Sequence, residues 1–306
     1  MGDRPRNPAP APVPPESPCG GRIPAMKRLP VLTLLSLLAL PDSEALAIDA
    51  SARSANVSVR LVPEVVSIQP GRPFTVAIHM TMAPSWHTYW KNPGDSGLPT
   101  RVVWTLPDGF RAGDLQWPVP AHAVDAGLAL YGYEREAVFL TEIAPGPDLP
   151  KGRFTVAAKV SWLECKDTCI PAKVNLELTL PSAEGTGKAA IDPASRALFA
   201  AARASMPRPP AGLKASHAVD EARLVLRIDG PPQKLGSPLE FFPETAGLIE
   251  AAAPQTVSRA VRGWTISMKR ASNAPAPPSI LQGVLVMTSA ARKMAYDISA
   301  TAATPR

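Results

Sequence analysis

Short runs of alternating or uniformly apolar residues dominate the chain from about Val57 onward, and most end at proline or glycine. Such runs predict β-strands, because successive side chains of a strand point to opposite faces. In the first half of the chain we expect strands at 57–62, 74–80, 101–104, 137–143, 154–162 and 174–180. Several short strands separated by turn residues, without helical periodicity, are typical of an antiparallel β-sandwich.

The pattern changes at 181–187 and resumes as strands after Leu213. Between them, an alanine-rich run extends to Ala204 after Asp192 and Pro193, residues that favour the first turn of a helix. Further strands are expected at 224–228, 239–242, 264–268, 280–287 and 295–298. The pattern therefore predicts an all-β protein. Two immunoglobulin-like antiparallel β-sandwich domains, 48–184 and 213–306, are joined by a linker, 185–212, that holds one short helix.

The N-terminal region contains a signal for secretion. Met26-Lys27-Arg28 is followed by an apolar run at 29–40 and by Ala45-Leu46-Ala47. A basic segment, an apolar core and a small-x-small site in this order predict a signal peptide at 26–47, cleaved after Ala47. A retained membrane anchor is the alternative. Residues 1–25, rich in proline and arginine, are expected to be disordered or to precede the true start at Met26.

Charge excludes one broad class of function. The formal net charge is +6 over 306 residues, and no run of like charges stands out. Nucleic-acid binding needs a concentrated basic patch or stripe, so no nucleic-acid partner is expected.

Cysteine usage is more informative than charge. Of three cysteines, Cys19 precedes the predicted signal peptide, so the mature chain keeps Cys165 and Cys169. This pair lies between two predicted strands and is separated by turn-compatible polar residues, so both sulfurs should lie at a hairpin tip. A disulfide there is sterically feasible and persists in an oxidising compartment.

The spacing of the pair leaves two interpretations open. A disulfide that closes so short a loop contributes only about 2 kcal/mol on the chain-entropy model, so it is a weak staple. Exposed disulfides of this kind are the ones that take part in exchange. Lys166 favours a thiolate, whereas Glu164 and Asp167 oppose it, so the local charges do not identify the nucleophile.

An aromatic segment is the other unusual feature of the sequence. Trp86-His87-Thr88-Tyr89-Trp90 precedes a loop rich in proline and glycine that ends at Thr100. Aromatic residues in this arrangement fit either sugar stacking or, more commonly, packing at the edge of a sandwich. His87 has no second ligand-type residue nearby, so it is weak evidence for a metal site.

Together these segments resemble the N-terminal periplasmic region of the DsbD/ScsB family of protein-disulfide reductases. The resemblance covers about 57–180 and extends more loosely through the linker helix to the strand at 239–243. It rests on four motifs in order: Trp86–Thr100, Leu115–Pro118, Leu130–Glu134 and Cys165-x3-Cys169-Ile170-Pro171.

The resemblance implies an immunoglobulin-like redox domain in which Cys165 and Cys169 exchange, with Cys169 forming the mixed disulfide. Leu130, Tyr131 and Gly132 align with the family's cap loop, which shields the cysteines until a partner docks. Leu130 stands where the best-known member has an aromatic residue, which puts the shielding in doubt.

The implied partners are a membrane electron-transfer protein of the DsbD or CcdA type and periplasmic thioredoxin-like or disulfide isomerase proteins. Full-length family members continue into a multi-span membrane domain and often a thioredoxin-like domain. We therefore expect either a separately encoded membrane partner or divergence to another use.

Thiol–disulfide exchange needs no cofactor and no metal, and none is expected. Two alternatives remain open. Cys-x3-Cys-x-Pro also resembles the copper site of Sco-type chaperones, and thiolates favour Cu(I), although that family has a thioredoxin-like fold. The other alternative is a non-enzymatic binding module that contains an inert disulfide.

Overall fold

The computed structural model describes residues 50–125, 127–183, 189–210, 212–220, 222–230, 238–288 and 293–303. The predicted signal peptide, the residues before it and Cys19 lie outside this part of the chain. Within the described ranges, no helix combines the length and the apolar character that a bilayer crossing requires.

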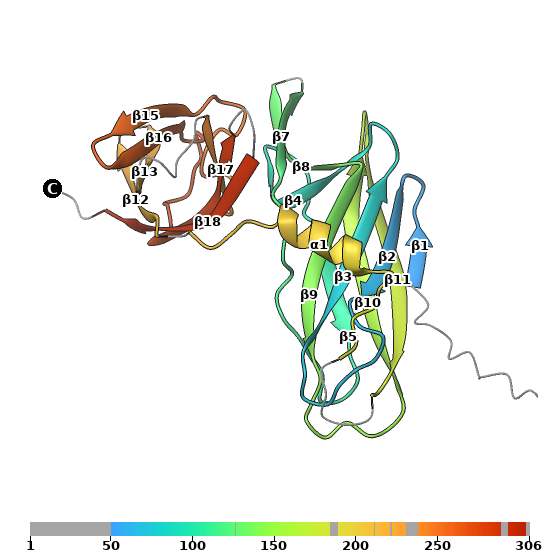
Figure 1. Ribbon diagram of the computed structural model, residues 1–306. Helices are drawn as coiled ribbons and strands as arrows, with labels where there is room; N and C mark the ends of the chain where they lie inside the picture. The colour runs from blue at the N-terminus through green and yellow to red at the C-terminus, as the bar shows by residue number, and fades with distance from the viewer. Residues whose placement is uncertain are drawn as a thin grey trace, which may run out of the picture. The chain divides into compact units, whose positions relative to one another are not determined.

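Residues before the helix form two β-sheets that pack against each other (Figure 1). The first has the order β1 (Ala50–Arg53), β2 (Val57–Pro63), β3 (Phe74–Met82), β9 (Glu136–Ala144), β6 (Arg111–Ala112). The second has the order β11 (Cys169–Pro181), β10 (Arg153–Cys165), β4 (His87–Gly94), β8 (Leu128–Glu134), β7 (Ala121–Asp125). The strand β5 (Arg101–Thr105) pairs with β10 beside β4.

The core of this sandwich follows from the period-two pattern. Every second residue of β2 is buried at Val57, Val59 and Leu61, and β10 and β11 contribute alternate buried residues in the same way. These side chains join one cluster with residues of β3 and β9. The predicted strands of this half are confirmed, whereas β1, β4, β6, β7 and β8 were not predicted as strands.

The hairpin of β10 and β11 is the longest element of the fold. The two strands pair without interruption from Arg153 opposite Pro181 to Cys165 opposite Cys169. Continuous pairing fixes which residues share a face, because a slip of one residue would turn every side chain to the other side. The position of the cysteine pair therefore follows from the register of the whole hairpin.

The helix begins later than the sequence predicts. α1 covers Arg196–Ser205 with Ser195 as its N-cap, whereas Asp192 and Pro193 form the turn before it. The side chain of Asp192 accepts a hydrogen bond from the Ala194 N–H at 3.0 Å, so it stabilises that turn rather than capping the helix. Phe199 is buried among residues of β2, β3 and β9, which packs α1 against the first sheet.

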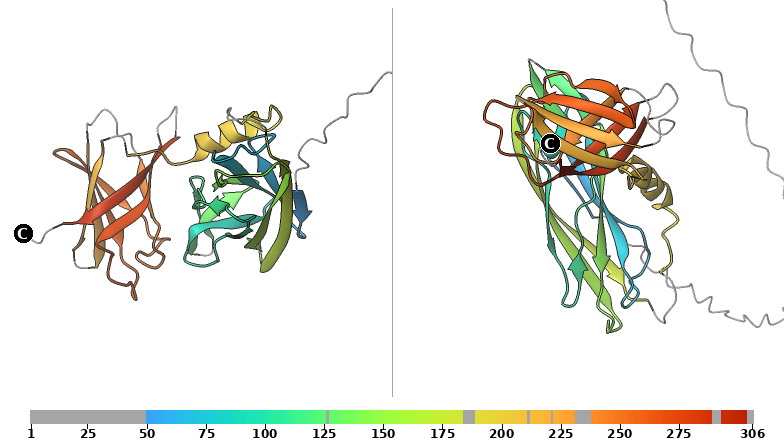
Figure 2. Two further views of the ribbon diagram at one scale, coloured as in Figure 1. Left: turned by 90° about the horizontal axis from the view of Figure 1, so that it is seen from below. Right: turned by 90° about the vertical axis from the view of Figure 1, so that its left-hand side faces the viewer.

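The chain after the helix forms one seven-stranded sheet that curls on itself (Figure 2). Phe241 from one end of the sheet and Ile266 from near the other share a single buried cluster. One pairing, between β12 and β18, is parallel, in contrast to the antiparallel pairing that the sequence predicts. The order is β14 (Leu239–Pro243), β17 (Ile280–Thr288), β18 (Lys293–Ala302), β12 (Lys214–Asp220), β13 (Arg223–Asp229), β16 (Gly263–Lys269), β15 (Thr256–Ala260).

Candidate redox site

The cysteine pair closes the tip of the long hairpin as a disulfide. The Sγ atoms of Cys165 and Cys169 are 2.04 Å apart, and the two Cα atoms are 4.1 Å apart. The expectation that both sulfurs lie at a hairpin tip is confirmed. On its other edge, β10 pairs with β4 only through Cys165 opposite His87, so the disulfide lies where three strands meet.

The two cysteines differ in their access to solvent. Cys165 is 1% exposed, whereas Cys169 is exposed at the start of β11. A disulfide is opened by a thiolate that reaches one of its sulfurs, so access determines which sulfur an external thiol attacks. The arrangement therefore favours attack by an external thiol at Cys169. Cys165 is left to react with Cys169 within the protein.

Tyr89 connects β4 to both sulfurs. Its hydroxyl donates a hydrogen bond to the Sγ of Cys165 at 3.1 Å and lies 3.4 Å from the Sγ of Cys169. The residue is 3% exposed, and burial raises the pKa of its hydroxyl, which keeps the group protonated. Tyr89 is therefore placed to donate to a thiolate on either cysteine.

The loop after β4 holds the ring of Tyr89 in place. Gly97 has a φ of +108°, and a Cβ there would lie 2.3 Å from a ring carbon of Tyr89. Only glycine fits this close approach and this backbone conformation. The same loop is tied to β8, because Asp95 accepts a hydrogen bond from the Ala129 N–H at 2.7 Å.

His87 lies behind Tyr89 on the same strand. Its Nε2 is 3.4 Å from the hydroxyl of Tyr89, and the two rings meet edge to face with centroids 5.4 Å apart. Burial lowers the pKa of His87, and the nearby carboxylates of Glu134 and Asp125 partly oppose that shift. The imidazole is therefore mostly neutral near pH 7, when it can accept or donate a single proton.

Glu164, which precedes Cys165, is a buried carboxylate. It accepts hydrogen bonds from the Ser54 hydroxyl, from Asn56 Nδ2 at 2.9 Å and from Trp162 Nε1 at 3.3 Å. These donors come from the turn between β1 and β2 and from β10 itself. The side chain is 1% exposed, so Glu164 anchors the end of β10 instead of presenting a free charge beside the cysteines.

A pocket of about 440 Å³ opens next to the disulfide. Beside both cysteines, its walls come from β4 and from the hairpin of β7 and β8, and they include His87, Tyr89, Asp125, Leu128, Leu130 and Glu134. Of the three residues that the resemblance assigns to a cap loop, Leu130 lines this pocket. All three lie in strand β8, so the segment is not a loop.

Tyr131 and Gly132 have other surroundings. Tyr131 is 1% exposed, and its ring lies 5.1 Å from that of His122 and 5.0 Å from that of Phe242 in β14. Gly132 pairs with Tyr89, and a Cβ there would lie 2.1 Å from the carbonyl oxygen of Thr88. Gly132 thus permits the close approach of β8 to the strand that carries Tyr89.

Within the part of the chain that the structure describes, no three side chains of the His, Cys, Asp or Glu type gather as a metal site.

Comparison with known proteins identifies the first half of the chain. Residues 58–181 match the family model described as thiol:disulfide interchange protein DsbD, N-terminal. These residues belong to that family. The DsbD N-terminal domain of this chain thus contains the disulfide, Tyr89, His87 and the pocket. Its family and its disulfide support a thiol–disulfide interchange module.

Solved structures extend the similarity in fold. The N-terminal periplasmic domain of ScsB from Proteus mirabilis aligns over 82% of this chain and 97% of its own, with 15% identity and a TM-score of 0.57. A chimeric titin Z1Z2 functionalized with a KLER exogenous peptide from decorin covers 83% of this chain and 100% of its own. Its identity is 10% and its TM-score is 0.18, so we infer nothing from it. No curated protein sequence matches the chain.

Sequence reasoning missed two groups of the DsbD N-terminal domain. Tyr89 and His87 were considered for packing and for a metal, although their spacing of two residues puts both on one face of a strand. No sequence pattern marks Asp125 and Leu128 as residues of the site. The pairing of β7 with β8 is what brings them to the cysteines.

We predict that Tyr89→Phe slows alkylation of the reduced pair by iodoacetamide about tenfold at neutral pH. The change removes a hydrogen bond to a charged sulfur, which contributes roughly 1.5 kcal/mol, and so raises the pKa of the cysteine. The measurement is the alkylation rate as a function of pH. Tyr131→Phe is the matched control, because its buried hydroxyl has no partner among the described residues. Equal rates for the two variants would contradict the role of Tyr89.

We also predict a pH dependence of stability that comes from His87. Because its pKa is lowered in the folded state, the unfolded state binds the proton more readily, and stability increases with pH. The contribution is complete above the ordinary value of about 6.5 and is lost below it, as the pH falls through the lowered pKa of the folded state. Urea unfolding on both sides of this value should show a smaller loss on acidification for His87→Gln than for the wild type. The same loss in both proteins would refute the prediction.

Proposed function

We propose that the chain carries reducing equivalents in the periplasm through the Cys165–Cys169 pair. The observation that supports this most directly is the asymmetric disulfide, with one exposed and one buried sulfur beneath the hydroxyl of Tyr89. An inert staple needs neither a pocket nor a donor directed at its sulfurs. The match to the DsbD N-terminal family supports the same chemistry.

The proposed reaction proceeds in two exchanges. The thiolate of Cys169 attacks a sulfur of the partner's disulfide, forming a mixed disulfide and releasing the partner's other sulfur as a thiolate. The thiolate of Cys165 then attacks the Sγ of Cys169, which frees the partner's second sulfur. Two electrons pass to the partner, two protons complete its thiols, and the Cys165–Cys169 disulfide remains.

Tyr89 and His87 assist this reaction in the proposal. The hydroxyl of Tyr89 lies within 3.4 Å of both sulfurs, so it can stabilise the charge on whichever cysteine is the thiolate. His87, with its Nε2 at 3.4 Å from that hydroxyl, keeps Tyr89 oriented and can exchange a proton with it. No bound cofactor is needed for these steps.

The partners proposed are those that the family implies. A membrane protein of the DsbD or CcdA type would reduce the pair, and thioredoxin-like or disulfide isomerase proteins would receive the electrons. Secretion by the predicted signal peptide would place the chain in the periplasm, the compartment named for the ScsB domain.

Single cysteine variants and a redox titration test this function. We expect a reduction potential between about −270 and −180 mV, the range of thioredoxin and disulfide isomerase, by glutathione titration. Cys165→Ser should accumulate a mixed disulfide with Ellman's reagent through Cys169. Cys169→Ser should react at least about tenfold more slowly, because Cys165 is buried. A potential below about −300 mV without exchange would identify a structural staple and favour the binding-module alternative.

We also propose that the shielding role expected of the cap loop belongs to Leu130, the one of its three residues that lines the pocket. Leu130 lines the same pocket as the two cysteines, so if it shields them, Leu130→Ala should increase the rate at which dithiothreitol reduces the pair by about threefold or more. The control is Val124→Ala, an exposed apolar residue of β7 that does not line the pocket. An unchanged rate for Leu130→Ala would show that Leu130 does not shield the cysteines.

A further inference from the structure

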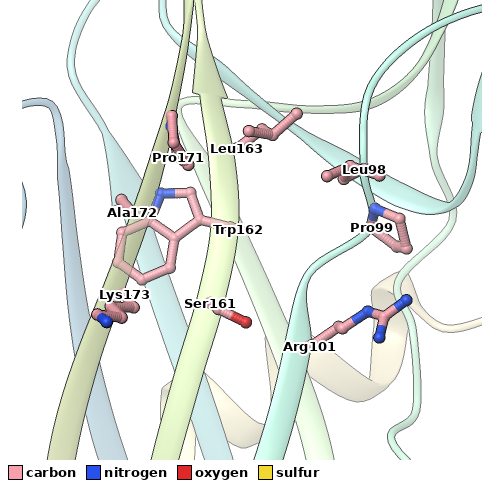
Figure 3. Close-up of a pocket in the computed structure, with 9 residues that line it drawn as sticks. All are labelled: Leu98, Pro99, Arg101, Ser161, Trp162, Leu163, Pro171, Ala172 and Lys173. Carbon is pink, nitrogen blue, oxygen red and sulfur yellow. The ribbon is translucent and has the colours of Figure 1, made fainter.

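A second hollow lies next to the disulfide, separate from the redox pocket. It has a volume of about 470 Å³ and lies between β10, β11 and the residues that precede β5 (Figure 3). We call it the β10 groove. Figure 3 shows Leu98 and Pro99 on one side and the side chains of the hairpin on the other. Its apolar lining consists of Leu98, Pro99, Trp162, Leu163, Pro171 and Ala172.

The groove lies in line with the cysteines. Leu163 pairs with Pro171 two positions before Cys165 pairs with Cys169. Residues two apart on a strand share a face, so this apolar pair and the cysteine pair project from the same face of the hairpin. Two residues of strand span about 7 Å. A chain bonded to Cys169 would therefore reach the groove within two or three residues of its own cysteine.

The far end of the groove is basic. Ser161 pairs with Lys173 on one side and with Arg101 on the other, so the two cations lie across neighbouring strands, about 10 Å apart. No acidic residue lines the groove, and neither cation has an ion-pair partner within the described ranges. Two cations without partners at the end of an apolar groove complement a ligand that carries carboxylates.

The edge of β10 is also open at this position. β5 pairs with β10 as far as Ser161, and β4 pairs with it at Cys165. Among the described residues, no strand pairs with 162–164 on this edge. Leu98, which is 59% exposed, adds apolar surface beside this edge. An extended peptide segment fits such an open edge better than a compact small molecule does.

We propose that the β10 groove binds an extended segment of the redox partner, apolar and acidic, that flanks the partner's reactive cysteine. This inference rests on the proposed exchange at Cys165 and Cys169 and specifies which protein surfaces that exchange accepts. Apolar side chains of the segment would pack on Leu163 and Leu98, and its carboxylates would face Arg101 and Lys173. The groove would thus hold the partner while the mixed disulfide forms.

Charge reversal tests the proposal with defined probes. The probes are two synthetic cysteine peptides, each a mixed disulfide with glutathione, in which leucine and either glutamates or lysines flank the cysteine. The reduced wild-type chain should reduce the acidic peptide about five- to tenfold faster at low salt, as expected for two partly exposed ion pairs. Arg101→Glu combined with Lys173→Glu should reverse this preference.

Two further variants distinguish binding in the groove from an effect of the protein's net charge. Arg153→Glu, at the far end of the same hairpin, is the matched charge control and should keep the preference for the acidic peptide. Leu98→Asn should slow both peptides about threefold, as expected when a half-exposed apolar contact is lost.

The outcomes distinguish the groove from the exchange chemistry. If the wild-type chain exchanges with both peptides equally and the double variant does the same, the groove proposal is wrong and the proposed function stands. If no peptide or small thiol exchanges in any variant, the proposed function itself fails. A shift in oligomeric state on charge reversal, measured by analytical ultracentrifugation, would instead assign the groove to a second copy of the chain and overturn the proposal.

Discussion

The register of the β10–β11 hairpin is the constraint on which the rest of the site depends. Thirteen consecutive pairs lead from Arg153 opposite Pro181 to Cys165 opposite Cys169, and the apolar residues on the inner face hold them against the core. A slip of one residue would turn both the cysteines and the core side chains to the wrong face. The strand pairing that builds the sandwich therefore also brings the two cysteines together, and a disulfide that contributes only about 2 kcal/mol need not drive it.

Around this pair, close backbone packing places Tyr89 beside the two sulfurs. Gly97 lets the loop after β4 rest on the ring of Tyr89, and Gly132 lets β8 approach β4. A buried hydroxyl with a raised pKa then lies beside two sulfurs, where low polarity strengthens each hydrogen bond. Glu164, which precedes Cys165, is buried and held by hydrogen bonds from Ser54, Asn56 and Trp162.

The sequence predicted the elements that bury apolar side chains with a period of two, and it placed the cysteines at a hairpin tip. It missed β4 and β8, because Pro93 and the shift in register after Tyr89 interrupt the alternation that identifies a strand. It also could not place Glu164, whose partners Ser54 and Asn56 are more than a hundred positions away. Local patterns predict strands, whereas a site assembled from strand pairing depends on contacts that no local pattern contains.

Two hollows near the hairpin tip separate the chemistry of the disulfide from the recognition of a partner. The redox pocket, with Tyr89 and His87, controls the charge on the sulfurs, whereas the β10 groove offers apolar and basic surface but no group that acts on a thiol. The loop 95–99 divides them, since Ser96 lines the pocket and Leu98 the groove. Gly97 lies between Ser96 and Leu98 in this loop, and its missing side chain lets the loop pack on the ring of Tyr89.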